Sequence, residues 1–141
     1  MTTQKSLPEN ELVDVAVGEL FARKAQEVAV LDLRGLSSLT DWIVVATCQS
    51  EVQLASALTG VRRALRSQST PALGAEGASK ARWGVLDYGT VIVHVFLREA
   101  REFYQLERLW SDAPRRDCKA EDFPAPVYEA TEGFEADEEQ W

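Results

Sequence analysis

Apolar residues along this chain alternate between two spacings, one typical of helices and one typical of strands. Residues 6–26 carry apolar side chains three and four positions apart, at Val13, Ala16, Val17 and Leu20, as on one face of a helix. By the same criteria we predict helices over residues 50–67 and 98–110, and strands over residues 28–33, 41–48, 83–87 and 90–97. The order α-β-β-α-β-β-α indicates one α/β domain, an α+β sandwich in which helices pack on a mixed β-sheet.

The first two predicted helices each begin with a capping box. Ser6 and Ser50 are the caps, and Glu9 and Gln53 follow them by three residues. Gly18 interrupts the first helix, where a glycine costs about 1 kcal/mol relative to alanine. This glycine predicts either close packing against the helix or a weak helix.

Two later elements have distinctive apolar patterns. The strand over residues 41–48 is apolar on both faces, so we place it in the centre of the sheet. The helix over residues 98–110 has helical apolar spacing, which predicts one buried face. That face comprises Phe103, Leu106, Leu109 and Trp110.

The apolar pattern is lost near the C-terminus. Residues 113–141 contain three prolines and follow neither the helical nor the strand period. Such a segment buries too little apolar surface to offset the entropy of ordering it. We therefore predict a folded domain over residues 1–112 and a disordered, acidic tail over residues 113–141.

The net charge of −8 is concentrated in this C-terminal region. Residues 111–141 hold ten acidic and three basic side chains, so the remainder of the chain is nearly neutral. A nearly neutral body with an acidic tail favours a basic protein as partner over naked nucleic acid, which requires a basic patch. Arg62, Arg63 and Arg66 are the best candidates for such a patch, but cations also favour the C-terminal turns of a helix, where these arginines lie.

Other features of the composition place the chain in a reducing, aqueous compartment. No apolar run approaches the roughly 18 residues that cross a bilayer, and the first residues resemble neither a secretory signal nor a transit peptide. Cys48 and Cys118 are 70 positions apart and form neither a disulfide framework nor a CxxC metal motif. We expect a cytoplasmic protein without membrane contact.

Catalytic chemistry has no positive support in the sequence. His94, the only histidine, has no evident nucleophile or orienting acid, so a structural or interface role is favoured. Asp32, Asp41 and Asp87 lie at strand ends or turns, yet none forms a DxD or DxE pair that would hold Mg²⁺. We predict no catalytic residues, no metal ligands and no cofactor.

Trp83, Asp87 and Tyr88 are the more suggestive group. Trp83 begins a predicted strand, and Tyr88 lies at a turn, where we expect its ring to be partly exposed. Trp and Tyr are frequent among the residues that dominate binding energy. The alternative is that Trp83 packs on the first helix and Tyr88 only occupies the turn, and the residues alone leave both open.

Two blocks of this sequence resemble the Iojap family of ribosomal silencing factors (RsfS). They are LDLRGLSSLTDWIVVATCQSEVQ, residues 31–53, and GAEGASKARWGVLDYGTVIVHVFLREAREFYQLERLW, residues 74–110. With the first helix, the similarity covers about residues 7–112. Its most specific elements are Trp followed by Asp-Tyr, the Val-His-Val strand that contains His94, and Tyr-x-Leu-Glu-x-Leu-Trp.

The resemblance implies a fold similar to that of nucleotidyltransferases and a function that is not enzymatic. Members of the family bind the fourteenth protein of the large ribosomal subunit on its intersubunit face, so that the small subunit cannot join and translation is repressed. The implied partner is therefore a basic ribosomal protein, without specific binding to nucleic acid. The implied partner-binding residues are Trp83, Leu86, Asp87 and Tyr88, and a homodimer is a further expectation.

Two positions depart from the family pattern Thr/Ser-Gly-x-Ser-x-Arg-Gln. Cys48 replaces the glycine and Val52 replaces the arginine, whereas Ser50 and Gln53 are retained. Two other functions stay as alternatives: a Mg²⁺-dependent, nucleotidyltransferase-like enzyme and an RNA-binding protein. The first would use the three aspartates named above with His94, and the second would use the three arginines.

Overall fold

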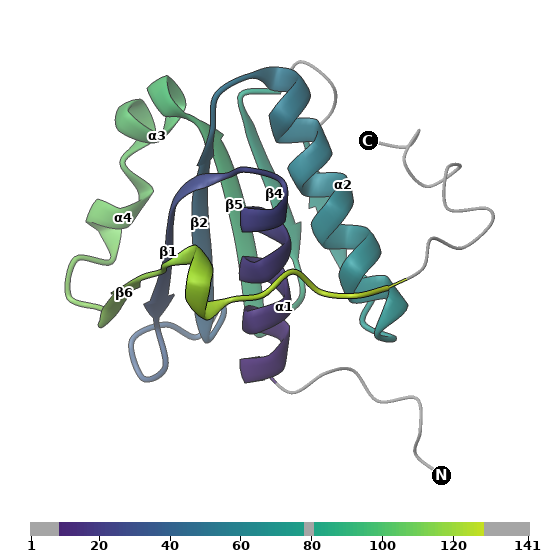
Figure 1. Ribbon diagram of the computed structural model, residues 1–141. Helices are drawn as coiled ribbons and strands as arrows, with labels where there is room; N and C mark the ends of the chain where they lie inside the picture. The colour runs from purple at the N-terminus through teal and green to yellow at the C-terminus, as the bar shows by residue number, and fades with distance from the viewer. Residues whose placement is uncertain (1–8, 78–80, 129–141) are drawn as a thin grey trace, which may run out of the picture.

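One β-sheet forms the centre of the molecule in a computed structural model that describes residues 9–77 and 81–128 (Figure 1). The elements are α1 (Glu9–Ala22), β1 (Gln26–Asp32), β2 (Trp42–Cys48), α2 (Glu51–Ser67), β3 (Gly74–Glu76), β4 (Trp83–Asp87), β5 (Val91–Leu97), α3 (Arg98–Tyr104), α4 (Leu106–Leu109), β6 (Arg115–Asp117) and a 3₁₀ turn at Ala120–Asp122. Within the described residues the strand order is β3-β4-β5-β2-β1-β6. The β2–β5 pair is parallel and the other pairs are antiparallel, so the predicted mixed sheet is confirmed.

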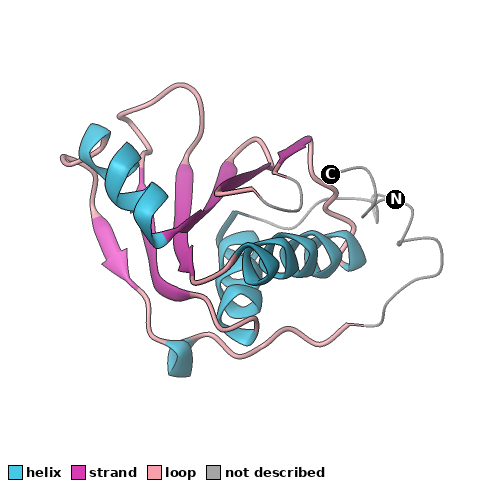
Figure 2. Cartoon of the chain, turned by 90° about the horizontal axis from the view of Figure 1, so that it is seen from above, coloured by secondary structure: helices cyan, strands magenta, loops and turns pink. Residues whose placement is uncertain are grey.

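Helices cover both faces of the sheet, and the two layers differ in size. The long helices α1 and α2 pack on one face, and the short helices α3 and α4 lie on the other (Figure 2). The strand β2 sits between β5 and β1 and is buried along nearly its whole length, which confirms its predicted central place. The larger core lies under α1 and α2, whereas a smaller core of Leu31, Leu33, Ile43, Val45, Phe96, Ala100 and Ala113 lies under α3 and α4.

Local sequence signals account for the helix starts and turns. The Ser50 side chain accepts a hydrogen bond from the Gln53 backbone N–H at 3.0 Å, so the predicted cap of α2 is confirmed. The cap predicted at Ser6 lies outside the described residues. The first helix ends at Ala22 rather than near residue 26, because the chain turns through Lys24 with φ of 71° and enters β1.

The helix predicted over residues 98–110 is broken. Gln105 has φ of 50°, in the left-handed region, and separates α3 from α4. The change of direction leaves the side chains of Phe103 and Leu109 79% and 75% exposed, so their predicted burial is wrong. Leu106 and Trp110 do pack against the smaller core.

Residues 113–128 pack on the domain, which corrects the prediction that disorder begins at residue 113. The strand β6 pairs with the edge of β1, and the Phe123 side chain is buried in the larger core. Further along, the Tyr128 hydroxyl donates to the Glu19 carboxylate at 3.1 Å. The segment has no apolar period because it crosses several elements and buries one side chain at a time. Residues 129–141 of the predicted tail lie outside the described residues.

This segment explains the glycine inside the first helix. A Cβ atom at Gly18 would lie 2.5 Å from the backbone carbonyl oxygen of Pro124, closer than any tolerated contact. The close packing predicted at Gly18 is therefore confirmed, and the group that makes it is the backbone of the C-terminal segment.

Replacing Gly18 with alanine tests this contact. At an ordinary helical site Gly18→Ala would stabilise the protein by about 1 kcal/mol, but here the Pro124 backbone must move. We expect a net destabilisation of about 1 to 3 kcal/mol, as for other overpacked sites, measured by urea unfolding. Glu11→Ala, on the exposed side of the same helix, is the control and should change stability by less than about 0.5 kcal/mol. A more stable Gly18→Ala protein would contradict the contact.

Candidate partner-binding surface

The residues of β4 alternate between the two faces of the sheet. Leu86 points toward α2 and is fully buried in the larger core, together with the Tyr88 ring, which is 7% exposed. Trp83 and Asp87 lie on the opposite face and are half-buried. The expected partial exposure of the Tyr88 ring is therefore wrong. Leu86 and Tyr88, which the family resemblance implied as partner-binding residues, belong to the core behind the surface that Trp83 occupies.

The Trp83 indole is held by three aromatic neighbours. It stacks on the Phe96 ring with centroids 4.9 Å apart and lies against the Tyr104 ring at 4.7 Å. Its Nε1–H donates a hydrogen bond to Nδ1 of His94 at 3.1 Å. Trp83 and Phe96 are cross-strand partners, so the register of β4 with β5 places the ring. The alternative that Trp83 packs on the first helix is excluded, because α1 lies across the sheet.

Two exposed aromatic side chains extend the surface from Trp83 onto α3. The Tyr104 side chain is 52% exposed, and Phe103 meets it edge-on with centroids 5.0 Å apart. Trp83, Phe103 and Tyr104 are called the aromatic surface below. They line a hollow of about 540 Å³ whose rim carries the ion pair between Arg82 and Glu99, with N and O 3.2 Å apart.

Sequence reasoning missed Phe103 and Tyr104 because their place depends on the break after α3. Helical spacing assigned Phe103 to a buried face, and nothing in the local sequence marks Gln105 as a left-handed residue.

Asp87 has a structural task beside the aromatic surface. Its Oδ1 accepts the backbone N–H of Gly89 at 2.8 Å, and Gly89 has φ of 85° in the turn from β4 to β5. Glycine adopts such a positive φ without steric cost. Asp87 therefore closes the hairpin and still contributes a half-exposed carboxylate to the same face of the sheet as Trp83.

His94 is buried and uncharged at neutral pH. Its side chain is on the same face as Trp83, and burial lowers the pKa of the imidazole from 6.5 to about 4. Because Nδ1 accepts the Trp83 N–H, the imidazole proton is on Nε2. The interface or structural role favoured for His94 is consistent with these contacts, which involve aromatic rings and no acid.

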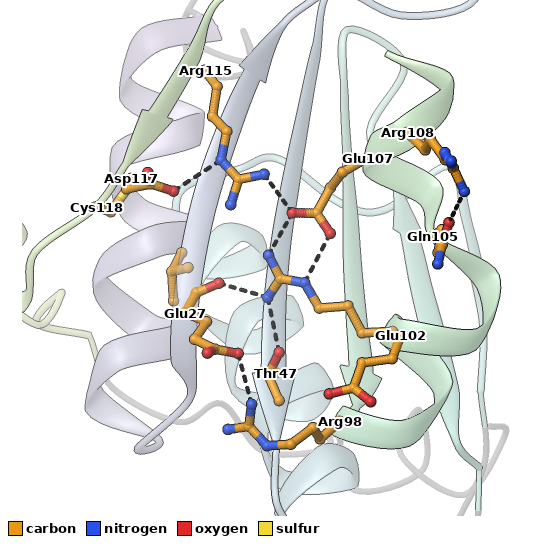
Figure 3. Close-up of a pocket in the computed structure, with 12 residues that line it drawn as sticks. Glu27, Thr47, Arg98, Glu102, Gln105, Glu107, Arg108, Arg115, Asp117 and Cys118 are labelled. Carbon is orange, nitrogen blue, oxygen red and sulfur yellow. Dashed lines mark hydrogen bonds and ion pairs between the residues drawn. The ribbon is translucent and has the colours of Figure 1, made fainter. Parts of the chain in front are cut away.

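A second hollow, of about 800 Å³, lies between α3 and the edge of the sheet and is lined by charged side chains (Figure 3). Arg101 is its anchor: Nε and Nη2 donate to Glu107 at 2.9 and 2.8 Å, and Nη1 donates to the Thr47 hydroxyl and the Glu27 carbonyl. The hydrogen bond from Arg101 holds the pKa of the Glu107 carboxyl below its usual range. Four arginines face four acids here, so the hollow favours neither anions nor cations.

The Arg101 contacts position α3 and hence the aromatic surface. Arg101 ties the helix to β1 and β2, and its pair with Glu107 spans the break at Gln105. The side chain of Arg101 is only 10% exposed, so its charge is largely withdrawn from water. The position of Tyr104 over Trp83 therefore depends on this ion pair.

The three aspartates of the enzyme alternative do not form one site. Asp32 lines a hollow on the α1 side of the sheet, where Arg34 holds it in an ion pair at 2.8 Å. Asp87 is on the other face of β4, and two strands separate β4 from β1. In the described part of the chain, no three His, Cys, Asp or Glu side chains come together as metal ligands.

The arginines of α2 and the two cysteines are the remaining residues singled out in the sequence. Arg62, Arg63 and Arg66 lie in the last turns of α2, as predicted. Cys48 is buried in the larger core and Cys118 follows β6, and both are free thiols. Over residues 9–77 and 81–128, no helix is long and apolar enough to cross a membrane.

Comparison with known proteins identifies the family. The model of the family described as "Ribosomal silencing factor during starvation" (RsfS) matches residues 5–140. The chain belongs to the RsfS family. The match runs through residues 113–128, in agreement with their place on the fold.

Individual relatives agree with this assignment. The ribosomal silencing factor RsfS of Halalkalibacterium halodurans is 35% identical over 104 residues, which are 74% of this chain and 89% of that protein. A mouse relative, "Mitochondrial assembly of ribosomal large subunit protein 1", is 28% identical and is covered over 45% of its length. A crystal structure of a Chromobacterium violaceum protein has a TM-score of 0.72 at 28% identity, with 89% of this chain and 98% of that chain covered.

Protonation of His94 should destabilise the fold. The folded pKa lies near 4 and the unfolded value near 6.5, so the unfolded chain takes up the proton first as pH falls. The stability contributed by neutral His94 is complete above pH 6.5 and declines between pH 6.5 and 4 by up to about 1.4 kcal/mol per pH unit. We expect the parent to lose about 2 kcal/mol more than His94→Asn between pH 7 and 4.5 in urea unfolding. Parallel pH profiles would refute the assignment.

Loss of the Arg101 charge should also destabilise the fold. Arg101→Met leaves Glu107 without its bidentate partner in a half-buried site, and we expect a loss of about 2 to 4 kcal/mol in chemical unfolding. Arg98→Met is the matched control on the same helix. Its ion pair with Glu27 is about half-exposed on both sides, so its removal should cost less than about 1 kcal/mol. Equal losses for the two variants would show that Arg101 does not anchor α3.

Proposed function

We propose that this protein represses translation by binding the large ribosomal subunit and preventing the small subunit from joining. It binds the fourteenth protein of the large subunit, on the face that meets the small subunit. It acts in the cytoplasm beside the ribosome and transforms no substrate. The aromatic surface with Asp87 is the part of the molecule that makes this contact.

Family membership and the chemistry of one surface support the proposal. The relatives are named as ribosomal silencing factors, and the name of the mouse relative refers to the large ribosomal subunit. The observation that carries the site is the group of three adjoining aromatic rings, the exposed Phe103 and Tyr104 beside the half-buried Trp83. Aromatic side chains of this kind are enriched where protein interfaces gain most of their binding energy.

The rigidity of this surface favours binding. Trp83 has the Phe96 ring behind it and Tyr104 beside it, so it loses little side-chain freedom when a partner covers it. Leu86 and Tyr88 contribute to binding only indirectly. As core residues on the other face of the sheet, they fix the position of β4. The revised binding set is therefore Trp83, Asp87, Phe103 and Tyr104.

Electrostatics favours a basic ribosomal protein as the partner. The chain carries a net charge of −8, and the Asp87 carboxylate lies on the same sheet face as Trp83. A negative field attracts a basic partner during encounter, and the aromatic rings then supply contacts from which water is excluded. The same negative charge disfavours binding to naked RNA.

The size of the domain is sufficient for inhibition by exclusion. A chain of about 120 ordered residues has a radius of gyration near 13 to 14 Å, so the domain measures roughly 30 Å across. Ribosomal subunits join through surfaces that must approach to contact. A body of this size on the joining face excludes the other subunit by volume, and an interface of about 800 Å² on each partner is sufficient to hold it.

Substitution of Trp83 tests the binding surface. Because Trp83 is the most enclosed ring of the aromatic surface, we expect Trp83→Ala to weaken co-sedimentation with purified large subunits about 30-fold, which corresponds to ~2 kcal/mol. The parent protein should raise the fraction of free subunits in a sucrose gradient, and Trp83→Ala should not.

The control for this experiment is Leu109→Ala, which removes an apolar side chain that is 75% exposed on α4, outside the aromatic surface. It should bind large subunits like the parent. If Trp83→Ala folds and binds as tightly as the parent, the surface is wrongly assigned. If the parent protein leaves subunit joining unchanged, the proposed function is wrong.

A further inference from the structure

The partner of the Trp83 N–H determines how the indole ring lies on the open face of the sheet. An indole has one donor, Nε1–H, and in this fold it is used inside the protein, on Nδ1 of His94 at 3.1 Å. His94 reaches it from β5, where it is the cross-strand partner of Val85, two pairs along from Trp83 and Phe96 and on the same face of the sheet. The indole ring of Trp83, which belongs to β4, therefore extends over β5.

Stacking alone would not fix this orientation. The Phe96 ring supports one face of the indole and Tyr104 lies beside it, but a flat stack permits rotation of the indole in its own plane. The hydrogen bond removes that freedom because it is directional. His94 is 9% exposed, so its acceptor is shielded from competing water.

We propose that His94 is a positioning residue for partner binding: its Nδ1 atom holds the Trp83 indole in the orientation that the partner recognises. This inference rests on the proposed function, since it assigns a task to a residue behind the same surface. His94 does not touch the partner itself. Without it, the indole N–H turns toward water, and the ring edge presented to the partner changes.

Substitutions at position 94 separate this role from simple packing. His94→Asn keeps an acceptor, Oδ1, at the same distance from the backbone as Nδ1, whereas His94→Leu keeps apolar bulk without an acceptor. Both variants are made in the full chain, and thermal unfolding verifies that each is folded. Trp83→Phe removes the donor and identifies the Trp83 signal among the indole N–H resonances of the four tryptophans.

The first readout is nuclear magnetic resonance of the Trp83 indole N–H. In the parent and in His94→Asn, this proton should exchange slowly with water. In His94→Leu, we expect exchange at least about tenfold faster and a shift toward the position of an indole in water, since the buried partner is lost. An unchanged signal in His94→Leu would overturn the proposal.

The second readout is affinity for purified large ribosomal subunits. We expect His94→Leu to bind large subunits about tenfold more weakly than the parent, which is the size of effect that loss of one hydrogen bond causes. The affinity of His94→Asn should lie within about threefold of that of the parent. A folded His94→Leu protein that binds like the parent would overturn the positioning role, as would equal losses in both variants. Failure of the parent itself to bind large subunits would refute the proposed function instead, so the two failures are distinguishable.

Discussion

Parallel pairing of β2 with β5 is the constraint on which the rest of this structure depends. The two strands run side by side over seven residue pairs, and a parallel pair is stable only when both of its faces are covered. Two layers of helices are therefore required. One combines α1, which precedes β1, with α2 from the connection between β2 and β5, and the other comes from the chain that follows β5. The first layer, α1 and α2, is long and covers its face of the sheet, whereas the second consists of the short helices α3 and α4.

The short second layer explains where a binding surface is left open. Because α3 has only seven residues, it covers the β1–β2 side and the end of β5 but leaves the Trp83 side of the sheet partly exposed. The side chains at this border are aromatic, and they pack against one another as well as facing solvent. Arg101 maintains the border by holding α3 on the sheet through Thr47 and Glu107. A small change in the contacts of Arg101 would move Tyr104 relative to Trp83. The geometry of the binding surface therefore depends on the same contacts that hold α3 in the fold.

Whereas α3 leaves part of one sheet face open, the C-terminal segment covers an edge of the sheet. It pairs with the exposed edge of β1, buries Phe123 and lies across α1 at Gly18. An unpaired edge strand invites association with other chains, and β6 covers this edge with three charged residues, Arg115, Arg116 and Asp117. The domain is therefore completed by residues that, taken alone, have the composition of a disordered tail.

Much of this architecture was determined by the sequence itself. The order of the main elements α1, β1, β2, α2, β4, β5 and α3 follows from periodicity, as does the central place of β2. The cap at Ser50 and the turn at Gly89 follow from residues with specific backbone preferences, which act over a few positions. Period two along β4 also places Leu86 on the face opposite to Trp83. Only the tertiary structure decided which face was left open, that the helix breaks at Gln105, and that residues 113–128 return to the domain. Those outcomes depend on contacts between residues more than fifty positions apart, such as Arg101 with Thr47 and Pro124 with Gly18. A local sequence pattern reports only on neighbouring positions and cannot predict such contacts.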